Sequence, residues 1–205
     1  MAKLTVTTFV TVDGVMQAPG GREEDRSGGF EHGGWVMPLF DEATGAFMVE
    51  VFERAEAFLL GRKTYEIFAG YWPQVTDEND PIATRLNTLP KYVASRSLES
   101  ADWQGSTVIR EVPADVAALK ERLGGELQVH GSGDLIQSLT AHDLVDVFNV
   151  LTFPVVLGTG KRLFAEGAAP AGLRLTGSHT TGTGVVISSY ERAGKPVYGD
   201  VPPPS

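Results

Sequence analysis

The sequence predicts an α/β protein with a mixed, mostly parallel sheet, helices on both faces and an antiparallel hairpin at the C-terminal end. Strand and helix patterns alternate along most of the chain, which is typical of parallel sheets whose crossover helices cover both faces. Two strand-to-helix junctions carry glycine, at Gly61 and at 131–133. Residues 173–178 and 184–190 are strand-like segments around a short polar turn, as in an antiparallel pair.

Length and composition exclude several classes of protein. The 205 residues, 42% of them hydrophobic, can form one sizeable core, so we expect a single domain over 1–193 and a proline-rich tail over 194–205. The absence of cysteine excludes disulfides and thiolate metal sites, and we assign no metal. A net charge of −9 opposes binding to nucleic acid. Because no apolar run resembles a signal peptide or a membrane helix, we expect a soluble, cytoplasmic protein.

The first strand has the most regular pattern in the chain. Between Lys3 and Val12, leucine and valine alternate mainly with threonine, and so many β-branched side chains favour a strand. Asp13 and Gly14 end this strand in a turn. The glycine-rich stretch 18–34 is expected to be a long irregular loop, either a functional cover or a disordered insertion.

A helix is predicted over 38–57, followed by a short buried strand over 57–60. Apolar residues recur at helical spacing in the first of these segments, while charged residues occupy the other faces. Asp41, near the helix N-terminus, has two interpretations. As a carboxylate at this position it caps the helix, and the capping preference alone accounts for it. The alternative is a proton donor, which requires that burial raise the pKa of Asp41.

The segment Phe58–Trp72 organises the rest of the chain. Its apolar strand breaks at Gly61 and continues as a helical pattern that begins with Arg62, Lys63 and Thr64. The first backbone N–H groups of a helix have no partner inside it, and the helix dipole adds partial positive charge there. Two cations and a hydroxyl at this position predict an anion site, although an ordinary turn with a solvated Arg-Lys pair is the alternative.

A second polar turn follows the strand predicted over 91–94. Ser95, Arg96 and Ser97 place two hydroxyls around an arginine, a set suited to binding phosphate through charge-assisted hydrogen bonds. Dinucleotide sites for a free ribose 2′-hydroxyl commonly carry an acidic residue at such a strand end, whereas an arginine accommodates a 2′-phosphate. The alternative is a plain polar turn.

The third junction follows the strand predicted over 127–130. There Gly131, Ser132, Gly133 and Asp134 lead into a helix, and glycines without Cβ atoms let a ligand approach the backbone closely. The remaining elements are predicted from pattern alone: helices over 81–89 and 113–123, a strand over 107–109, and a long strand over 144–157 in which Pro154 indicates an edge or a bulge.

All three turns follow the carboxyl ends of predicted strands, where open α/β sheets bind their ligands. We therefore expect them to converge on one edge of the sheet and to bind an extended ligand with several phosphates. A dinucleotide with a 2′-phosphate fits this description. Glycine turns that bind no ligand at all are the alternative.

Four segments in this order resemble a known family: LLGRKTYE, YVASRS, VHGSGDLIQSL and LVDVFNVLTFPVVLGTGKRLF. They resemble the dihydrofolate reductase-like proteins, which include the reductase domain of the bacterial bifunctional riboflavin-biosynthesis deaminase/reductase, over roughly residues 4–190. The resemblance implies a mixed eight-stranded sheet, NADPH as the hydride donor and often a homodimer.

The resemblance also implies roles for the three turns. Arg62 and Thr64 would engage the 2′-phosphate and pyrophosphate region, 95–97 the adenosine 2′-phosphate, and 131–133 the pyrophosphate. The complete set expected to bind the cofactor is Gly61, Arg62, Lys63, Thr64, Ser95, Arg96, Ser97, Gly131, Ser132, Gly133 and Asp134.

Two catalytic positions follow from the same resemblance. The turn at Asp13 matches a family turn near the nicotinamide and the substrate, and Asp41 is the nearest candidate for the carboxylate that folate-type reductases use as proton source. We therefore expect an NADPH-dependent reductase of a small heterocyclic substrate, of the pterin or pyrimidine-riboside type. A non-catalytic nucleotide-binding or sensing module on the same fold is the alternative. The aromatic residues Trp35, Phe40, Tyr71 and Trp72 either line a flat pocket or belong to the core.

Overall fold

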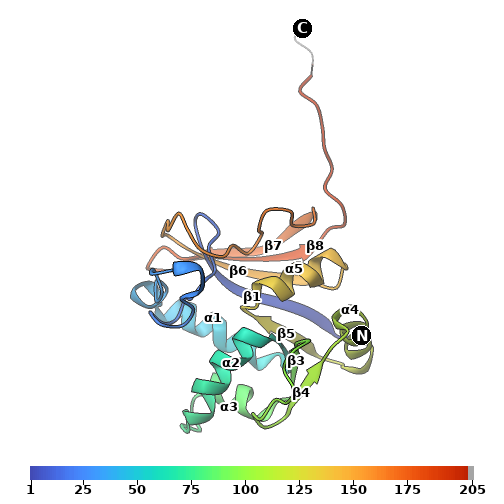
Figure 1. Ribbon diagram of the computed structural model, residues 1–205. Helices are drawn as coiled ribbons and strands as arrows, with labels where there is room; N and C mark the ends of the chain where they lie inside the picture. The colour runs from blue at the N-terminus through green and yellow to red at the C-terminus, as the bar shows by residue number, and fades with distance from the viewer. Residues whose placement is uncertain (203–205) are drawn as a thin grey trace.

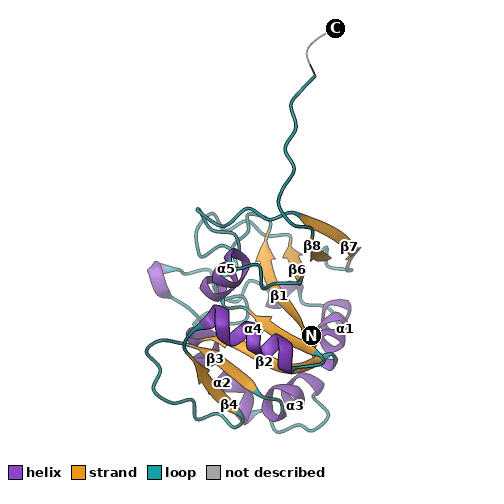
Figure 2. Ribbon diagram, turned by 90° about the vertical axis from the view of Figure 1, so that its right-hand side faces the viewer, coloured by secondary structure: helices purple, strands orange, loops and turns teal. Residues whose placement is uncertain are grey.

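The computed structural model describes residues 1–202 and consists of eight strands in one sheet with helices on both faces (Figures 1 and 2). The strands are β1 (Lys3–Thr11), β2 (Ala55–Gly61), β3 (Lys91–Ala94), β4 (Ser106–Ile109), β5 (Glu126–His130), β6 (Val147–Phe153), β7 (Leu173–Thr180) and β8 (Val186–Arg192). The helices are α1 (Glu42–Glu53), α2 (Arg62–Tyr71), α3 (Pro81–Thr88), α4 (Val112–Arg122) and α5 (Gly133–Ala141), with short 3₁₀ turns at Ser27–Gly29, Met37–Leu39 and Trp72–Gln74.

The strand order is β4-β3-β2-β5-β1-β6-β8-β7. Strands β1 to β6 pair in parallel, while β8 is antiparallel to both β6 and β7. Each parallel crossover in the first half of the chain carries helix or loop over one face of the sheet, as parallel pairing requires. The predicted fold class, with its C-terminal antiparallel hairpin, is confirmed.

Alternation along the strands produces an apolar core on each face of the sheet. Helices α4 and α5 pack on one face, against residues such as Val6 and Val129. Helices α1, α2 and α3 cover the other face, against residues such as Phe58 and Leu151. Phe58 is fully buried, and burial of such a side chain contributes about 2 kcal/mol to stability. The two cores together hold β1 and β5 at the centre of the molecule.

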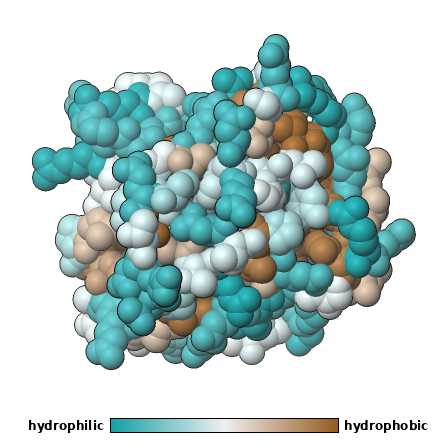
Figure 3. Space-filling view, turned by 90° about the horizontal axis from the view of Figure 1, so that it is seen from below, coloured by the Kyte–Doolittle hydropathy of each residue, from teal (hydrophilic) through white to brown (hydrophobic). Residues whose placement is uncertain are grey.

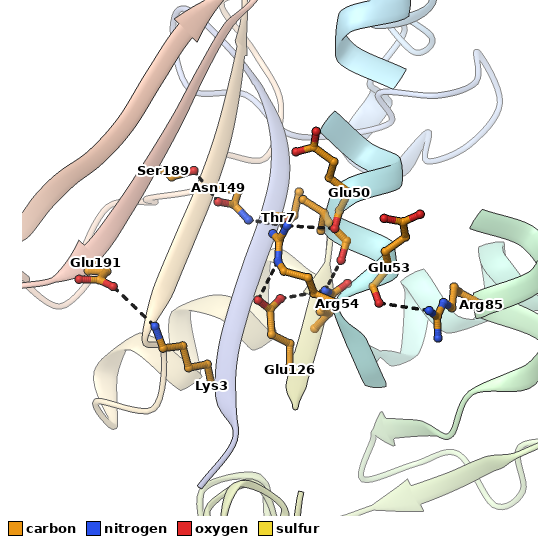
Figure 4. Close-up of polar contacts among 12 residues, drawn as sticks. Lys3, Thr7, Glu50, Glu53, Arg54, Arg85, Glu126, Asn149, Ser189 and Glu191 are labelled. Atoms are coloured by element: carbon orange, nitrogen blue, oxygen red, sulfur yellow. Dashed lines mark hydrogen bonds and ion pairs between the residues drawn. The ribbon is translucent and has the colours of Figure 1, made fainter. Parts of the chain in front are cut away.

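The face of β1 that α1 covers also carries buried polar groups, and Thr7 is hydrogen-bonded across the neighbouring strands. Asn149 of β6 donates to Thr7 Oγ1 of β1 at 3.1 Å, and Ser189 Oγ of β8 donates to Asn149 Oδ1 at 2.8 Å (Figure 4). The same view shows Arg54, which follows α1, bonded through Nε to Glu126 of β5 at 3.0 Å. These contacts link the end of α1 and four strands, β1, β5, β6 and β8.

The surface is mostly hydrophilic where it is viewed from below the orientation of Figure 1 (Figure 3). Apolar residues appear there as separate patches between hydrophilic ones. Exposed apolar side chains also occur on the outer hairpin and after it, at Leu173, Leu175, Val197 and Tyr198. Within residues 1–202, no helix combines the length and the apolar character needed to cross a membrane.

Two segments differ from the sequence-based expectation. The long strand expected over 144–157 is only β6, and Pro154 follows its last residue. Strand β6 pairs with β1 on one side and β8 on the other, so the prediction of an edge or a bulge is wrong. Because proline lacks an N–H group, it ends the ladder here instead of marking a sheet edge. The helix expected over 38–57 begins only at Glu42, after a 3₁₀ turn, and its last residues belong to β2.

In the tail, 195–202 contains no helix or strand, and 203–205 lie outside the described residues.

Lys91, at the start of β3, is a fully buried cation. Its Nζ donates to the carbonyl oxygens of Leu86 at 2.7 Å and Leu89 at 2.8 Å, at the C-terminal end of α3, and lies 4.5 Å from the ring centroid of Trp103. The partners are therefore dipoles and a π-face, and burial lowers the pKa of Lys91 to about 8.

This lowered pKa predicts a stability that rises with pH. Lysine has an ordinary pKa of 10.5 and Lys91 one of about 8 in the folded chain, so the unfolded chain binds more protons between these values. The free energy of unfolding of wild type, relative to that of Lys91→Met, should therefore rise with pH through this window, by at most about 1.4 kcal/mol per pH unit. Urea unfolding of both proteins across the window measures the difference. The exposed Lys3→Met is the control, and parallel pH profiles for wild type and Lys91→Met would contradict the prediction.

Candidate functional site

The three polar turns lie side by side at the carboxyl edge of the sheet. Strand β2 is the neighbour of both β3 and β5 and runs parallel to each. Gly61, the last residue of β2, pairs in register with Ala94, the last residue of β3. The turns after these strands and after His130 therefore leave the same edge, as the sequence predicts.

Two side-chain hydrogen bonds join these turns to one another. Ser132 Oγ accepts from the N–H of Gly61 at 2.9 Å, and Arg62 Nη1 donates to Ser97 Oγ at 2.7 Å. Arg62 is further oriented by its Nε, which bonds to Glu66 one turn along α2 at 2.6 Å. The turn after β3, the N-terminus of α2 and the N-terminus of α5 thus form one connected surface.

Glycine at these turns allows one turn to pack closely against another. A Cβ atom on Gly61 would lie 3.3 Å from Cβ of Ser132, and one on Gly131 would lie 3.4 Å from Thr64 Oγ1. Gly131 also has a positive φ of 59°, which favours glycine. The sequence suggests these glycines for close approach of a ligand, whereas the structure shows that they first allow the turns to approach each other.

Helices α2 and α5 both begin at this edge without a side-chain cap. The N–H groups of their first turns therefore point outward with the positive ends of the two helix dipoles, a combination that attracts anions. Arg62 and Lys63 add two cations at α2. Asp134 lies in the first turn of α5. Its carboxylate interacts favourably with the positive end of the helix dipole, but it repels an anion.

In the turn after β3, Ser95 and Arg96 have different roles. Ser95 is buried, and its Oγ accepts from the N–H groups of Ser97 at 3.3 Å and Leu98 at 3.0 Å, so its hydroxyl holds its own turn together. Arg96 is exposed, and its side chain has no hydrogen bond or ion pair to any residue among 1–202. Its guanidinium is therefore the available cation of this turn.

Asp41 caps α1. Its Oδ1 accepts from the N–H of Thr44 at 2.9 Å and from Thr44 Oγ1 at 2.8 Å, while Oδ2 accepts from the N–H of Thr183 at 3.2 Å and from Thr183 Oγ1 at 3.1 Å. These hydrogen bonds, with that of the Thr44 N–H foremost, hold the pKa of Asp41 well below its usual range. The capping interpretation is confirmed. The raised pKa on which the proton-donor alternative depended is not found, because both oxygens are surrounded by donors that favour the charged form.

Asp13 ties the turn after β1 to the glycine-rich turn after β6. Its Oδ1 accepts from Thr11 Oγ1 at 2.6 Å and the N–H of Leu157 at 3.2 Å, and its Oδ2 accepts from the N–H of Gly158 at 2.8 Å. The Thr11 hydroxyl contributes most to lowering the pKa of Asp13 to about 2. The residue lies at the same edge of the sheet as the three turns, and its catalytic role stays a prediction.

His130, the last residue of β5, is buried directly before the third turn, and sequence reasoning gave it no role. Its ring stacks on Phe52 with 4.4 Å between centroids, and its Nε2 lies 3.1 Å from Gln128 Oε1. Gln128 Nε2 donates to the carbonyl oxygen of Val51 and to Glu126, so its amide oxygen faces the imidazole and His130 Nε2 carries the proton. Burial lowers the pKa of His130 to about 3, which keeps the ring neutral.

The loop 18–34 is held against α2 and the turn after β6 by Asp25. Asp25 Oδ2 lies 2.5 Å from Lys161 Nζ and Oδ1 lies 4.0 Å from Lys63 Nζ, while Ser27 Oγ accepts from Lys161 Nζ at 2.7 Å. Burial opposes ionisation of Asp25, but the hydrogen bonds of Lys161 and Ser27 outweigh it and lower the pKa to about 2. We call these contacts the Asp25 latch. They favour the interpretation of the loop as a cover.

Gln17 is hydrogen-bonded to the backbone of the latch residues. It is 5% exposed, and its amide donates to the carbonyl oxygens of Asp25 at 3.0 Å and Ser27 at 2.9 Å while accepting from the N–H of Lys161 at 3.0 Å. A shallow, open hollow of about 390 Å³ lies between this loop and α2, lined by Glu24, Asp25, Arg26, Lys63, Glu66 and Ile67. The latch residues are too far apart in sequence to form a motif, so no spacing could have revealed them.

The four aromatic residues named from the sequence do not form one pocket wall. Trp35 is buried and packs edge-on against Phe153 at 5.6 Å between centroids, with its indole N–H donating to the backbone. Trp72 is partly buried, and Tyr71 is 60% exposed. Trp35 therefore belongs to the core.

Comparison with known proteins assigns this arrangement to a family. Residues 2–187 match the RibD C-terminal domain family. The chain belongs to the RibD C-terminal domain family. Membership confirms the resemblance seen in the sequence motifs. Among curated proteins, YyaP of Bacillus subtilis (strain 168), which has no characterised function, is 26% identical over 190 residues, or 92% of this chain and 94% of YyaP.

Solved structures with the same fold include three that differ in description. A putative riboflavin biosynthesis protein from Shewanella sp. PV-4 has a TM-score of 0.67 at 22% identity and covers 93% of this chain and 99% of its own. A deaminase/5-amino-6-(5-phosphoribosylamino)uracil reductase from Thermotoga maritima has a TM-score of 0.63 at 13% identity, over 94% of this chain and 57% of its own. Dihydrofolate reductase from Enterococcus faecalis, complexed with NADP(H), has a TM-score of 0.59 at 14% identity, over 93% and 96%.

The Asp25 latch predicts a specific change in loop dynamics. Asp25→Asn keeps the size of the side chain but removes the charge that Lys161 and Lys63 contact, so the loop 18–34 should open more often. We expect its backbone amides to exchange with deuterium about fivefold faster, which corresponds to about 1 kcal/mol.

Glu23→Gln is the matched control, because Glu23 pairs with Arg26 at the surface and both side chains are largely exposed. Its exchange rates should equal those of wild type. Equal exchange in all three proteins would show that the latch does not hold the loop.

Proposed function

We propose that this member of the RibD C-terminal domain family is an NADPH-dependent reductase that transfers hydride to a small heterocyclic substrate. Family membership and the reductase-like neighbours support a reductase-type function and thus an oxidoreductase. The use of NADPH is proposed from the connected surface of three turns, which the Ser132–Gly61 and Arg62–Ser97 hydrogen bonds join.

The residues of this surface fit NADPH. The N-termini of α2 and α5 suit two linked phosphates, and Arg62 with Arg96 suits a 2′-phosphate through charge-assisted hydrogen bonds. The neighbour from Enterococcus faecalis is described with NADP(H), which supports the same cofactor class. When bound, NADPH supplies the hydride, and the residues of this chain hold its phosphates, orient it and exclude water.

The substrate is proposed to be of the pterin or pyrimidine-riboside type. The descriptions of the Thermotoga maritima and Enterococcus faecalis proteins name a phosphoribosylaminouracil reductase and a dihydrofolate reductase, and both act on ring systems of this kind. Asp41 supplies no proton in this proposal, because its carboxylate is held ionised by the Thr44 and Thr183 hydrogen bonds. The proton then comes from another group or from water.

The lowered pKa of Asp41 is also the observation that favours a second candidate function. A nucleotide-binding or sensing module needs the phosphate grip but no proton donor. The two functions separate when bound NADPH is exposed to a panel of pterins and aminopyrimidine ribosides. Oxidation of the cofactor by one of them identifies the enzyme, and binding without oxidation identifies the module.

A homodimer is part of the proposal. Strand β7 is one of the two edge strands, each of its residues is exposed, and its outer backbone groups have no partner strand in the described structure. An open edge of this kind is a template for pairing with another chain.

Sedimentation equilibrium should give twice the mass of the chain, and a Pro substitution at Thr176, in the middle of β7, should shift the protein toward the monomer. A monomer at all concentrations would contradict the dimer.

Arg96 provides the test of the cofactor assignment. Wild type should bind NADPH at least about tenfold more tightly than NADH, a difference of about 1.4 kcal/mol, because only NADPH carries the 2′-phosphate. Arg96→Ala should erase this preference by weakening NADPH and leaving NADH unchanged. Calorimetric titration measures both constants.

Arg85→Ala is the matched control. Arg85 lies near the C-terminal end of α3 and donates to the carbonyl oxygen of Glu53 at 3.2 Å, so its removal changes the net charge equally without touching the turns. Its preference for NADPH should remain that of wild type. Equal affinity of wild type for the two cofactors would contradict the assignment.

A further inference from the structure

Ser132 has a backbone conformation that its side chain disfavours. It is the N-cap of α5 with φ 62° and ψ 50°, in the left-handed region where residues with a Cβ atom are strained. Glycines precede and follow it, so a third glycine would relieve the backbone. A serine here requires a reason that lies in its hydroxyl.

The hydroxyl makes two hydrogen bonds within the protein. Ser132 Oγ accepts from the N–H of Gly61 at 2.9 Å and donates to the carbonyl oxygen of His130 at 3.3 Å. A hydroxyl has one hydrogen to donate, and an ionised phosphate oxygen only accepts. Ser132 therefore has no hydrogen left for a phosphate unless it releases His130, which argues against the role of direct phosphate ligand expected from the sequence.

What Ser132 does hold is the relative position of two helix N-termini. Gly61 is the N-cap of α2, and Ser132 is the N-cap of α5. The bond between them crosses from the turn after β2 to the turn after β5, and Gly131 packs beside it against Thr64 of α2. The N–H group of Gly61 is thereby turned sideways toward α5, and those of the following residues are left to face a ligand.

We propose that Ser132 is a positioning residue that sets the separation of the α2 and α5 N-termini for a ligand with two linked phosphates. This inference rests on the proposed function, since NADPH is such a ligand. Ser132 does not touch the ligand in this arrangement. It fixes the two anion-binding ends so that both meet the pyrophosphate without reorganisation on binding.

The test uses two variants that separate positioning from stability. Ser132→Ala removes the hydroxyl and keeps the backbone strain, whereas Ser132→Gly removes the hydroxyl and relieves it. If Ser132 positions the turns, both variants should bind NADPH about tenfold more weakly than wild type. The thermal midpoint of Ser132→Gly should nevertheless lie above that of Ser132→Ala. Affinity and stability then change independently.

Adenosine 2′-monophosphate is the probe that isolates the pyrophosphate region. It carries only the 2′-phosphate, so it engages Arg62, Arg96 and their turn but not the gap between the two helices. Both Ser132 variants should bind it within about twofold of wild type. Ser100→Ala, which removes an exposed hydroxyl bonded to Asp102, is the control and should match wild type for both ligands.

The contrary outcomes are distinct. Unchanged NADPH affinity in both variants overturns the positioning role. Parallel loss of affinity for both ligands, in step with the thermal midpoint, also overturns it, because it assigns Ser132 to overall folding. If wild type itself binds neither ligand, the proposed function fails, and the inference fails with it.

Discussion

The pairing of β2 with β3 on one side and β5 on the other is the constraint on which the site depends. It brings the turns after three separate strands to one edge, with Gly61 opposite Ala94 in register. A shift of β2 by one residue would turn Phe58 from the α1 core to the opposite face. The same shift would move the N–H of Gly61 away from Ser132. The packing of the core and the geometry of the phosphate-suited edge are therefore fixed together.

Side chains and backbone have different roles at this edge. The hydroxyls of Ser95, Ser97 and Ser132 each bond within or between the turns, so they shape the turns themselves. Free N–H groups at the two helix N-termini and the guanidinium of Arg96 remain for a ligand. Such support of binding groups by a second set of residues is what gives a site its precision. The proposed anion site thus consists mainly of backbone groups with few cations, which accords with a net charge of −9.

The sequence predicted the fold class because strand alternation, helix spacing and turn chemistry agree along most of the chain. It located the three turns because glycine and hydroxyl residues directly after a strand have a local cause. It failed at Pro154, where a missing N–H fits the end of a strand as well as a sheet edge, and only pairing partners separate the two. It missed the Asp25 latch and the support from Gln17, since these contacts join residues 17, 25, 63 and 161. It could not show that the Ser132 hydroxyl bonds to Gly61 and His130, because these contacts exist only in the folded chain.

Asp13, Asp25 and His130 lie near this edge, and each makes the fold less stable as the pH falls, but in separate pH ranges. Asp13 and Asp25 have pKa values lowered to about 2 from an ordinary 3.8, so their contribution to stability is lost only as pH falls below the ordinary value and through the folded one. Burial lowers the pKa of His130 from 6.5 to about 3. Between these pH values the imidazole binds a proton in the unfolded chain but not in the folded chain. Between pH 6.5 and 3.8, the loss of stability from this group of residues therefore belongs to His130. Its carbonyl oxygen accepts from Ser132 and its ring is stacked on Phe52, so the residue whose burial opposes protonation lies at the strand end from which the third turn begins.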